Sequence, residues 1–196
     1  MQPNKQYSVD WFSKNITKFQ KIFQQFILNR KNNNIHFLEI GSFEGRSSCW
    51  FFENYIFNSA NSTITCVDTW EGSEEHDSSV KQKLYERFLN NVSEYPKNKF
   101  LIKRGLSRVV LKSLPENYYD FIYIDGSHST RDVLEDAVLS FDLLKSGGII
   151  TFDDYEWNHF SDPLLNPKLG IDSFITSYKN YIELIEESYQ LTIIKK

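Results

Sequence analysis

The segment from residue 121 to residue 154 limits most strongly what this chain can fold into. It contains two short apolar runs, Phe121–Ile124 and Ile149–Phe152, and each run is typical of a buried strand. Apolar residues between the two runs recur at helical spacing over about four turns. A strand, a helix and a strand joined by short connections form a βαβ unit, so we expect two parallel strands in one sheet.

Capping residues indicate where the helix of this unit begins and ends. Ser129 is a favourable N-cap, and Asp132 places an acid in the first turn, near the positive end of the helix dipole. Gly147 and Gly148 are expected to end the helix, because glycine accepts the left-handed cap conformation without a Cβ clash. The apolar face of the predicted helix comprises Val133, Leu134, Ala137, Val138, Phe141 and Leu144.

Three carboxylates and an imidazole follow these two strands. Asp125 and His128 come after the first strand, and Asp153 and Asp154 come directly after the second. Parallel strands of one unit end at the same edge of a sheet, which is where open α/β sheets bind ligands. A single acid often only caps a loop or a helix, but three converging carboxylates repel one another. The pattern therefore predicts a site for a hard divalent cation, which prefers carboxylate oxygens.

The composition indicates one folded domain and excludes several classes of function. The 196 residues are 40% hydrophobic, which suffices for a core and argues against disorder. A net charge of −4 without a long basic stripe argues against nucleic acid as a partner. The sequence has no apolar run long enough to cross a membrane, and its start lacks the apolar core of a signal peptide. We therefore expect a cytoplasmic protein with no membrane partner.

The first part of the chain is predicted to form a helical flap. An amphipathic helix is expected over residues 9–29, because apolar residues recur there every three or four positions. We accordingly divide the chain into an N-terminal helical flap, residues 1–34, and a main domain, residues 35–196. The apolar face of the predicted helix comprises Phe12, Ile16, Phe19, Phe23 and Phe26.

A glycine turn follows the first predicted strand, Ile35–Ile40. Gly41 permits a tight turn, and Gly45 allows the next helix, residues 46–55, to begin close to the sheet or to a ligand. A helix start offers backbone N–H groups and a positive dipole end. The spacing is neither GxGxxG nor a P-loop, and ordinary strand-to-helix turns also use glycine. The turn alone is therefore a weak indication of a ligand.

An acid stands at the tip of the second predicted strand, Thr63–Val67. Asp68 follows that strand and lies 23 residues after Gly45. In a nucleotide-binding half, an acid at this position accepts hydrogen bonds from the hydroxyls of a ribose. The alternative is an acid that caps the next turn. Together with the glycine turn, the spacing favours ribose binding.

The remaining elements alternate in type and end in a predicted hairpin. Two strands joined by only a few residues at the end of the chain are expected to be antiparallel. A long aromatic connection, residues 155–170, either lines a substrate through Trp157, His159 and Phe160 or is an ordinary surface loop. The other predicted elements are a helix over 80–95, a strand over 100–103, a short helix over 107–114 capped by Ser107, a helix over 171–179, and strands over 181–185 and 191–194.

Four stretches together resemble a known family. LEIGSFEG, VDTWEGSEEH, YIDGSH and GGIITFDDY are similar to class I S-adenosylmethionine-dependent methyltransferases. Within that class the chain resembles the metal-dependent sugar O-methyltransferases of the macrocin and mycinamicin type, and cephalosporin-hydroxylase-like proteins. The resemblance covers about residues 35–196. Asp153 lies 28 residues after Asp125, which is also the separation of the metal-binding acids in that group.

The resemblance implies a fold and a reaction. The fold is α/β and Rossmann-like, with a mostly parallel seven-stranded sheet, helices on both faces, and a C-terminal hairpin whose last strand lies between the fifth and the sixth. The reaction is transfer of a methyl group from S-adenosylmethionine to a hydroxyl of a small molecule, a sugar or a glycan, with Mg²⁺ or another divalent cation. A homo-oligomer is compatible with this resemblance.

The resemblance also assigns roles to individual residues. Catechol-type relatives have Asp-Asn at the position of Asp153 and Asp154, so the more acidic pair favours the sugar branch. Two other functions stay open: a metal-independent methyltransferase, and a non-catalytic partner protein that binds the cofactor. The implied roles are cofactor binding by Glu39, Gly41, Ser42, Gly45, Asp68, Ser107 and Asp125, metal binding by Asp125, Asp153 and Asp154, and catalysis by Asp125 and by His128 as general base.

Overall fold

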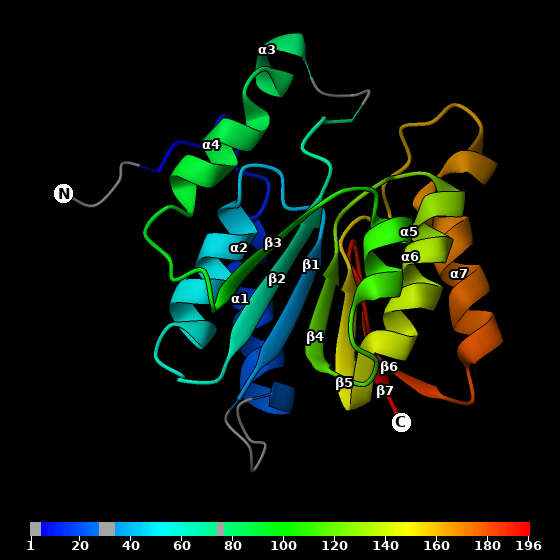
Figure 1. Ribbon diagram of the computed structural model, residues 1–196. Helices are drawn as coiled ribbons and strands as arrows, with labels where there is room; N and C mark the ends of the chain where they lie inside the picture. Colours follow the sequence, from blue (N-terminus) through cyan, green and yellow to red (C-terminus); the bar gives the residue numbers. More distant parts are fainter. Residues whose placement is uncertain (1–4, 28–33, 74–76) are drawn as a thin grey trace.

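The computed structural model describes residues 5–27, 34–73 and 77–196. Its centre is a seven-stranded sheet in the order β3-β2-β1-β4-β5-β7-β6 (Figure 1). The first five strands pair in parallel, and β7 is antiparallel to both β5 and β6. The strands are β1 (His36–Ile40), β2 (Thr63–Asp68), β3 (Phe100–Arg104), β4 (Tyr119–Ile124), β5 (Leu144–Phe152), β6 (Ile182–Glu187) and β7 (Leu191–Lys195).

Helices cover both faces of this sheet. Figure 1 shows α1, α2 and α4 on one side of it and α5, α6 and α7 on the other. The predicted architecture is therefore confirmed, including the last strand between the fifth and the sixth. The helices are α1 (Ile16–Ile22), α2 (Arg46–Phe51), α3 (Ser78–Lys81), α4 (Leu84–Asn91), α5 (Ser107–Val110), α6 (Thr130–Leu143) and α7 (Pro167–Tyr178).

Alternating side chains of the strands build two hydrophobic clusters. Phe37 of β1 faces α1 and α2, whereas its neighbour Leu38 belongs to the cluster that contains α6 and α7. The period of two in a strand explains this division, because successive side chains point to opposite faces. A sheet buried on both faces also explains why the predicted strands are continuous apolar runs.

The N-terminal segment packs on a face of the sheet. A 3₁₀ turn, Ser13–Asn15, leads into α1, and a π-helical turn, Phe23–Ile27, follows it. Phe19 packs edge-on against the ring of Tyr123, with ring centroids 5.3 Å apart. The predicted apolar spacing thus buries this helix, and residues 28 and 29 of the predicted helix lie outside the described part of the chain.

Several predicted helix boundaries differ from the structure. The helix predicted over 171–179 begins at Pro167, and the N-terminal helix predicted from residue 9 begins only at Ser13. The helix predicted over 80–95 is two helices, because Lys83 adopts a left-handed conformation with φ 57°. Arg87 explains the break, since its guanidinium donates to the carbonyls of Val80 and Gln82. The helix of the βαβ unit ends at Leu143 rather than at the glycines, because buried Leu144 already pairs with Tyr119 in the sheet.

None of the described helices is long and apolar enough to cross a membrane. The carboxyl ends of β1, β2, β4 and β5 meet at one edge of the sheet (Figure 1). The loops after these strands therefore lie side by side, although the chain separates them by tens of residues.

Candidate active site

The loop that follows β1, residues 41–45, is held close to the end of β4. Gly41 has φ 85°, and a Cβ atom at this position would lie 1.8 Å from the carbonyl oxygen of Asp125. No side chain fits there, so glycine is required by close backbone approach. Gly45 has φ 80° and precedes α2, where a Cβ would lie 3.1 Å from the ring of Phe88. Packing against α4 is thus one reason for the second glycine.

Asp68 holds this loop from the side of β2. Its Oδ2 accepts hydrogen bonds from the backbone N–H groups of Ser42 and Phe43, each at 2.8 Å, and its Oδ1 accepts one from Trp70 at 2.7 Å. The indole Nε1 of Trp70 donates to the carbonyl of Phe43 at 2.9 Å. These bonds restrain Phe43, whose φ of 47° costs about 1 kcal/mol or more in a residue other than glycine.

Glu39 lies beneath the loop and is fully buried. Burial raises the pKa of its carboxyl group, and hydrogen bonds from neighbouring serines oppose that shift. Ser48 of α2 donates to Oε2, while Oε1 has no hydrogen-bond partner among the described residues. Glu39 therefore contacts α2 through Ser48. Ser42 of the loop is buried as well.

The turn after β3 joins the same edge through the end of β2. The backbone N–H of Gly105 donates to the carbonyl of Asp68 at 2.9 Å, and Ser107 is the first residue of α5. Beside this turn lies Asp136 of α6, only 2% exposed, whose Oδ1 has no partner among the described residues. Asp136 was not predicted from the sequence, because a single acid beside the apolar face of a helix is not a motif.

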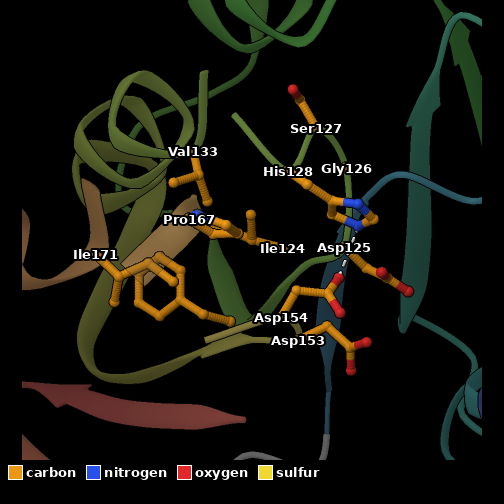
Figure 2. A pocket seen from close by; sticks show the side chains of 11 residues that line it. Ile124, Asp125, Gly126, Ser127, His128, Val133, Asp153, Asp154, Pro167 and Ile171 are labelled. Carbon is orange, nitrogen blue, oxygen red and sulfur yellow. Dashed lines mark ion pairs between the residues drawn. The ribbon is translucent and has the colours of Figure 1, made fainter. Parts of the chain in front are cut away.

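Asp125, His128 and Asp154 form a compact group at the ends of β4 and β5 (Figure 2). Each offers one ligand atom, and these atoms all lie within 4.8 Å of one another. The Nε2 of His128 lies 2.9 Å from Oδ2 of Asp154, the pair joined by the dashed line in Figure 2. The carboxylates of this group suit a divalent metal ion, and the imidazole lies within hydrogen-bond distance of one of them.

Asp153 faces a different set of partners. Its Oδ1 accepts hydrogen bonds from Tyr123 at 2.5 Å, from Asn15 at 3.5 Å, and from the side-chain amide of Gln190. Figure 2 shows its carboxylate below the pair of His128 and Asp154. Tyr123 and Gln190 were not predicted from the sequence, because nothing local marks a strand tyrosine or a hairpin glutamine as a partner of Asp153.

Electrostatics of this edge favour a positive charge. Burial raises the pKa of Asp125 well above its usual value, and the charges of Asp153 and Asp154 raise it further. Burial, followed by the charge of Asp154, raises the pKa of Asp153 to about 6. A cation between the carboxylates would favour their ionised forms and reverse these shifts.

An aromatic wall flanks the group on the side of the loop that follows β5. The ring of Trp157 lies 4.6 Å from that of His128, measured between centroids. His159 and Phe160 each pack against Trp157 at 4.9 Å. Tyr189 donates to Oδ1 of Asp154 at 3.2 Å from the β6–β7 turn. Of the three aromatic residues that the sequence suggested, Trp157 contacts the group through His128, and His159 and Phe160 pack on Trp157.

The profile of a protein family described as "Methyltransferase domain" matches residues 38–155, more than half of the chain. The chain belongs to this methyltransferase family. The matched stretch runs from β1 past β5 and contains the glycine loop, Asp68 and the acidic group. An uncharacterized protein of Acanthamoeba polyphaga mimivirus is 27% identical over 157 residues. That match covers 77% of this chain and 66% of the relative, so it spans slightly less than two thirds of the relative's length.

Solved methyltransferase structures share the fold. A TDP-rhamnose 3′-O-methyltransferase of calicheamicin biosynthesis superposes with a TM-score of 0.62 at 15% identity, covering 92% of this chain and 79% of that one. An O-methyltransferase from Bacillus cereus in complex with S-adenosylhomocysteine gives 0.61 at 18% identity, with coverages of 96% and 84%. A Streptomyces achromogenes O-methyltransferase of tomaymycin synthesis, bound to S-adenosylmethionine, gives 0.61 at 14% identity, with coverages of 90% and 80%.

These findings confirm the class I methyltransferase fold and the family that the sequence resembles. The chain therefore contains a methyltransferase domain with the class I fold.

Asp136 gives this methyltransferase a testable dependence of stability on pH. Burial raises its pKa from 3.8 to about 7, Ser107 opposes the shift through a hydrogen bond, and Asp132 and Glu135 add to it. A raised pKa means that the folded state binds the proton more tightly than the unfolded state. This contribution to stability is therefore complete below pH 3.8 and is lost as the pH rises to about 7.

We expect Asp136→Asn to remove that loss. Between pH 5 and pH 8 the unfolding free energy of the parent should fall by about 2–3 kcal/mol more than that of the variant. Urea unfolding of both proteins at the two pH values measures this difference. Parallel pH profiles would show that Asp136 does not titrate as its burial implies.

Proposed function

We propose that this methyltransferase transfers the methyl group of S-adenosylmethionine to a hydroxyl of a small molecule or sugar, and that it uses Mg²⁺ or another divalent cation. The observation that carries the proposal is the group of Asp125, His128 and Asp154. This group combines metal-binding carboxylates with a base at the edge where the cofactor loop ends.

The residues of the β1 and β2 ends fit the cofactor. Gly41 and Gly45 have no side chains, so the backbone of the loop lies close to the edge of the sheet. Ser42 and Glu39 are buried next to them. Asp68 has one lone pair of Oδ1 that its three backbone partners leave open, which a ribose hydroxyl can use. Ser107 would border the adenine. S-adenosylmethionine supplies an activated methyl group, so the protein mainly positions the acceptor and removes its proton.

The acids fit a divalent cation. Asp125 and Asp154 would hold it, with Asp153 as the third carboxylate, and the raised pKa values of Asp125 and Asp153 show how poorly this edge tolerates its charges alone. A divalent cation supplies Lewis-acid chemistry there by lowering the pKa of a substrate hydroxyl. The hydrogen bonds of Tyr123 and Gln190 hold Asp153 in a fixed orientation beside the other two acids.

His128 would remove the hydroxyl proton. Its Nε2 lies 2.9 Å from Oδ2 of Asp154, so the imidazole is oriented by that carboxylate and can act as a base near neutral pH. Trp157 packs against the imidazole and keeps the ring in place. The acceptor oxygen would lose its proton to the imidazole of His128 and take the methyl group in line, which leaves the cofactor as the neutral thioether.

The walls of the site favour a ring-shaped acceptor. Trp157 and Phe160 present aromatic surface beside His128, and the faces of sugar rings and of phenols both pack on such surface. The TDP-rhamnose methyltransferase that shares the fold acts on a sugar hydroxyl, which supports the sugar class. Screening sugar nucleotides, glycosides and catechols for methyl transfer will identify the acceptor.

Asp68 provides the test of the cofactor site. We expect Asp68→Ala to weaken cofactor binding by about 1.5–3 kcal/mol, the range for hydrogen bonds to a charged group. Asp68→Asn keeps an acceptor for the loop amides but loses the charge, so its loss should be smaller. Calorimetric titration with S-adenosylhomocysteine measures both variants. Parental affinity in the alanine variant would remove Asp68 from the cofactor site.

The metal is tested by direct binding, which does not require the acceptor. Asp125→Asn, Asp153→Asn and Asp154→Asn should each weaken Mn²⁺ binding about tenfold or more, as seen by calorimetry. Asp172→Asn is the matched control, since Asp172 bonds to Tyr155 outside the acidic group. Once an acceptor is found, chelator should abolish methyl transfer and Mg²⁺ should restore it. Full activity in excess chelator would instead support the metal-independent methyltransferase.

A variant of His128 distinguishes a role in proton removal from a role in binding cofactor or metal. His128→Ala should lower the maximal rate by about 10²–10⁴, the usual contribution of a general base, while the affinities for cofactor and Mn²⁺ stay nearly parental. Steady-state kinetics together with the two titrations measure this pattern. A folded variant with parental turnover would assign the proton to another group and leave His128 as a cap of the turn before α6.

A further inference from the structure

Glu44 lies inside the glycine loop, but its side chain binds two segments that are distant in the sequence. The carboxylate is 1% exposed. It accepts hydrogen bonds from the backbone N–H of Ser8 at 2.6 Å, from the Ser8 hydroxyl at 2.8 Å, and from Nε of Arg87 at 2.7 Å. The N-terminal segment and α4 therefore meet at one side chain of the loop.

Asn91 makes a second connection among the same three segments. It is fully buried at the end of α4. Its Nδ2 donates to the carbonyl of Glu44 at 2.9 Å and to the carbonyl of Gln6 at 2.8 Å, and its Oδ1 accepts from the N–H of Gln6 at 2.8 Å. Loop, α4 and N-terminal segment thus form one hydrogen-bonded unit.

The conformation of the loop explains why it requires support from outside. Phe43 is in a left-handed conformation between two glycines that also have positive φ. Strained backbone persists only where its surroundings over-determine it. Asp68 and Trp70 restrain the loop at Ser42 and Phe43, whereas Glu44 and Asn91 restrain it one residue further along.

We propose that Glu44 is a positioning residue for the cofactor. Through its carboxylate, residues 6–8 and Arg87 hold the loop 41–45 in the shape that binds S-adenosylmethionine, although none of these groups contacts the reacting atoms. The N-terminal segment is accordingly a part of the cofactor site and not only a cover of the sheet. This inference rests on the proposal that the loop 41–45 binds the cofactor.

The test compares affinity with stability in matched variants. In Glu44→Gln the amide N–H₂ faces one of the donors that the carboxylate accepted, so one bond is lost and Arg87 loses its charged partner. We expect S-adenosylhomocysteine to bind about tenfold more weakly, equivalent to about 1.4 kcal/mol. Calorimetry without metal or acceptor measures this affinity, and thermal unfolding shows at which temperature each variant is folded.

Two further comparisons separate positioning from plain stabilisation. Ser8→Ala removes the hydroxyl donor and should weaken binding about threefold, whereas Ser8→Thr keeps the donor and should bind like the parent. Glu53→Gln is the control, because Glu53 also ties down the N-terminal segment, through Lys5 and Tyr95, without contacting the loop. It should change stability but leave the affinity at the parental value.

The outcomes distinguish this inference from the proposed cofactor site. Parental affinity in Glu44→Gln, or equal affinities in Ser8→Ala and Ser8→Thr, overturns the positioning role. If Asp68→Ala weakens binding in the same experiments, the cofactor site itself stands. If neither Asp68→Ala nor Glu44→Gln changes the affinity of a parent that binds, the cofactor lies elsewhere and both proposals fall.

Discussion

The contact between Gly41 and the backbone of Asp125 fixes the distance between the two halves of the site. A Cβ at Gly41 would lie 1.8 Å from the carbonyl oxygen of Asp125, so the loop after β1 and the end of β4 approach as closely as two backbones can. The parallel pairing of β1 with β4 leads directly into this contact. The loop that we assign to the cofactor therefore begins beside the strand end that carries Asp125 of the acidic group.

Charge repulsion dominates the acidic half of the site, which comprises Asp125, Asp153 and Asp154. Three carboxylates lie at the ends of two neighbouring strands, and the pKa of Asp125 is raised by its burial and by the other two acids. Native proteins seldom keep such groups close together without a compensating partner. Tyr123 and Gln190 compensate Asp153 by hydrogen bonds, and His128 pairs with Asp154. A cation would complete this arrangement, which is why we propose a metal-dependent transfer.

Hydrogen bonds shape the cofactor half. The loop 41–45 carries three positive φ values within five residues, and side chains from β2, from α4 and from the N-terminal segment restrain it. Asp68 illustrates that two interpretations of one residue can hold together. It caps the loop amides, as an ordinary turn acid does, and its Oδ1 keeps one lone pair for the ribose hydroxyl that we propose it binds.

The sequence by itself determined the order of strands and helices, the two buried faces of the sheet, and the position of Asp68, Asp125 and Asp154 at strand ends. Periodicity and chain order are local signals, and parallel pairing then places strand ends at one edge. Only the tertiary structure decided that Asp153 bonds to Tyr123 and Gln190, that Arg87 divides a predicted helix, and that Glu44 joins Ser8 to α4. Hydrogen bonds between residues that are tens of positions apart leave no periodic trace in the sequence, because their partners meet only after the core has packed.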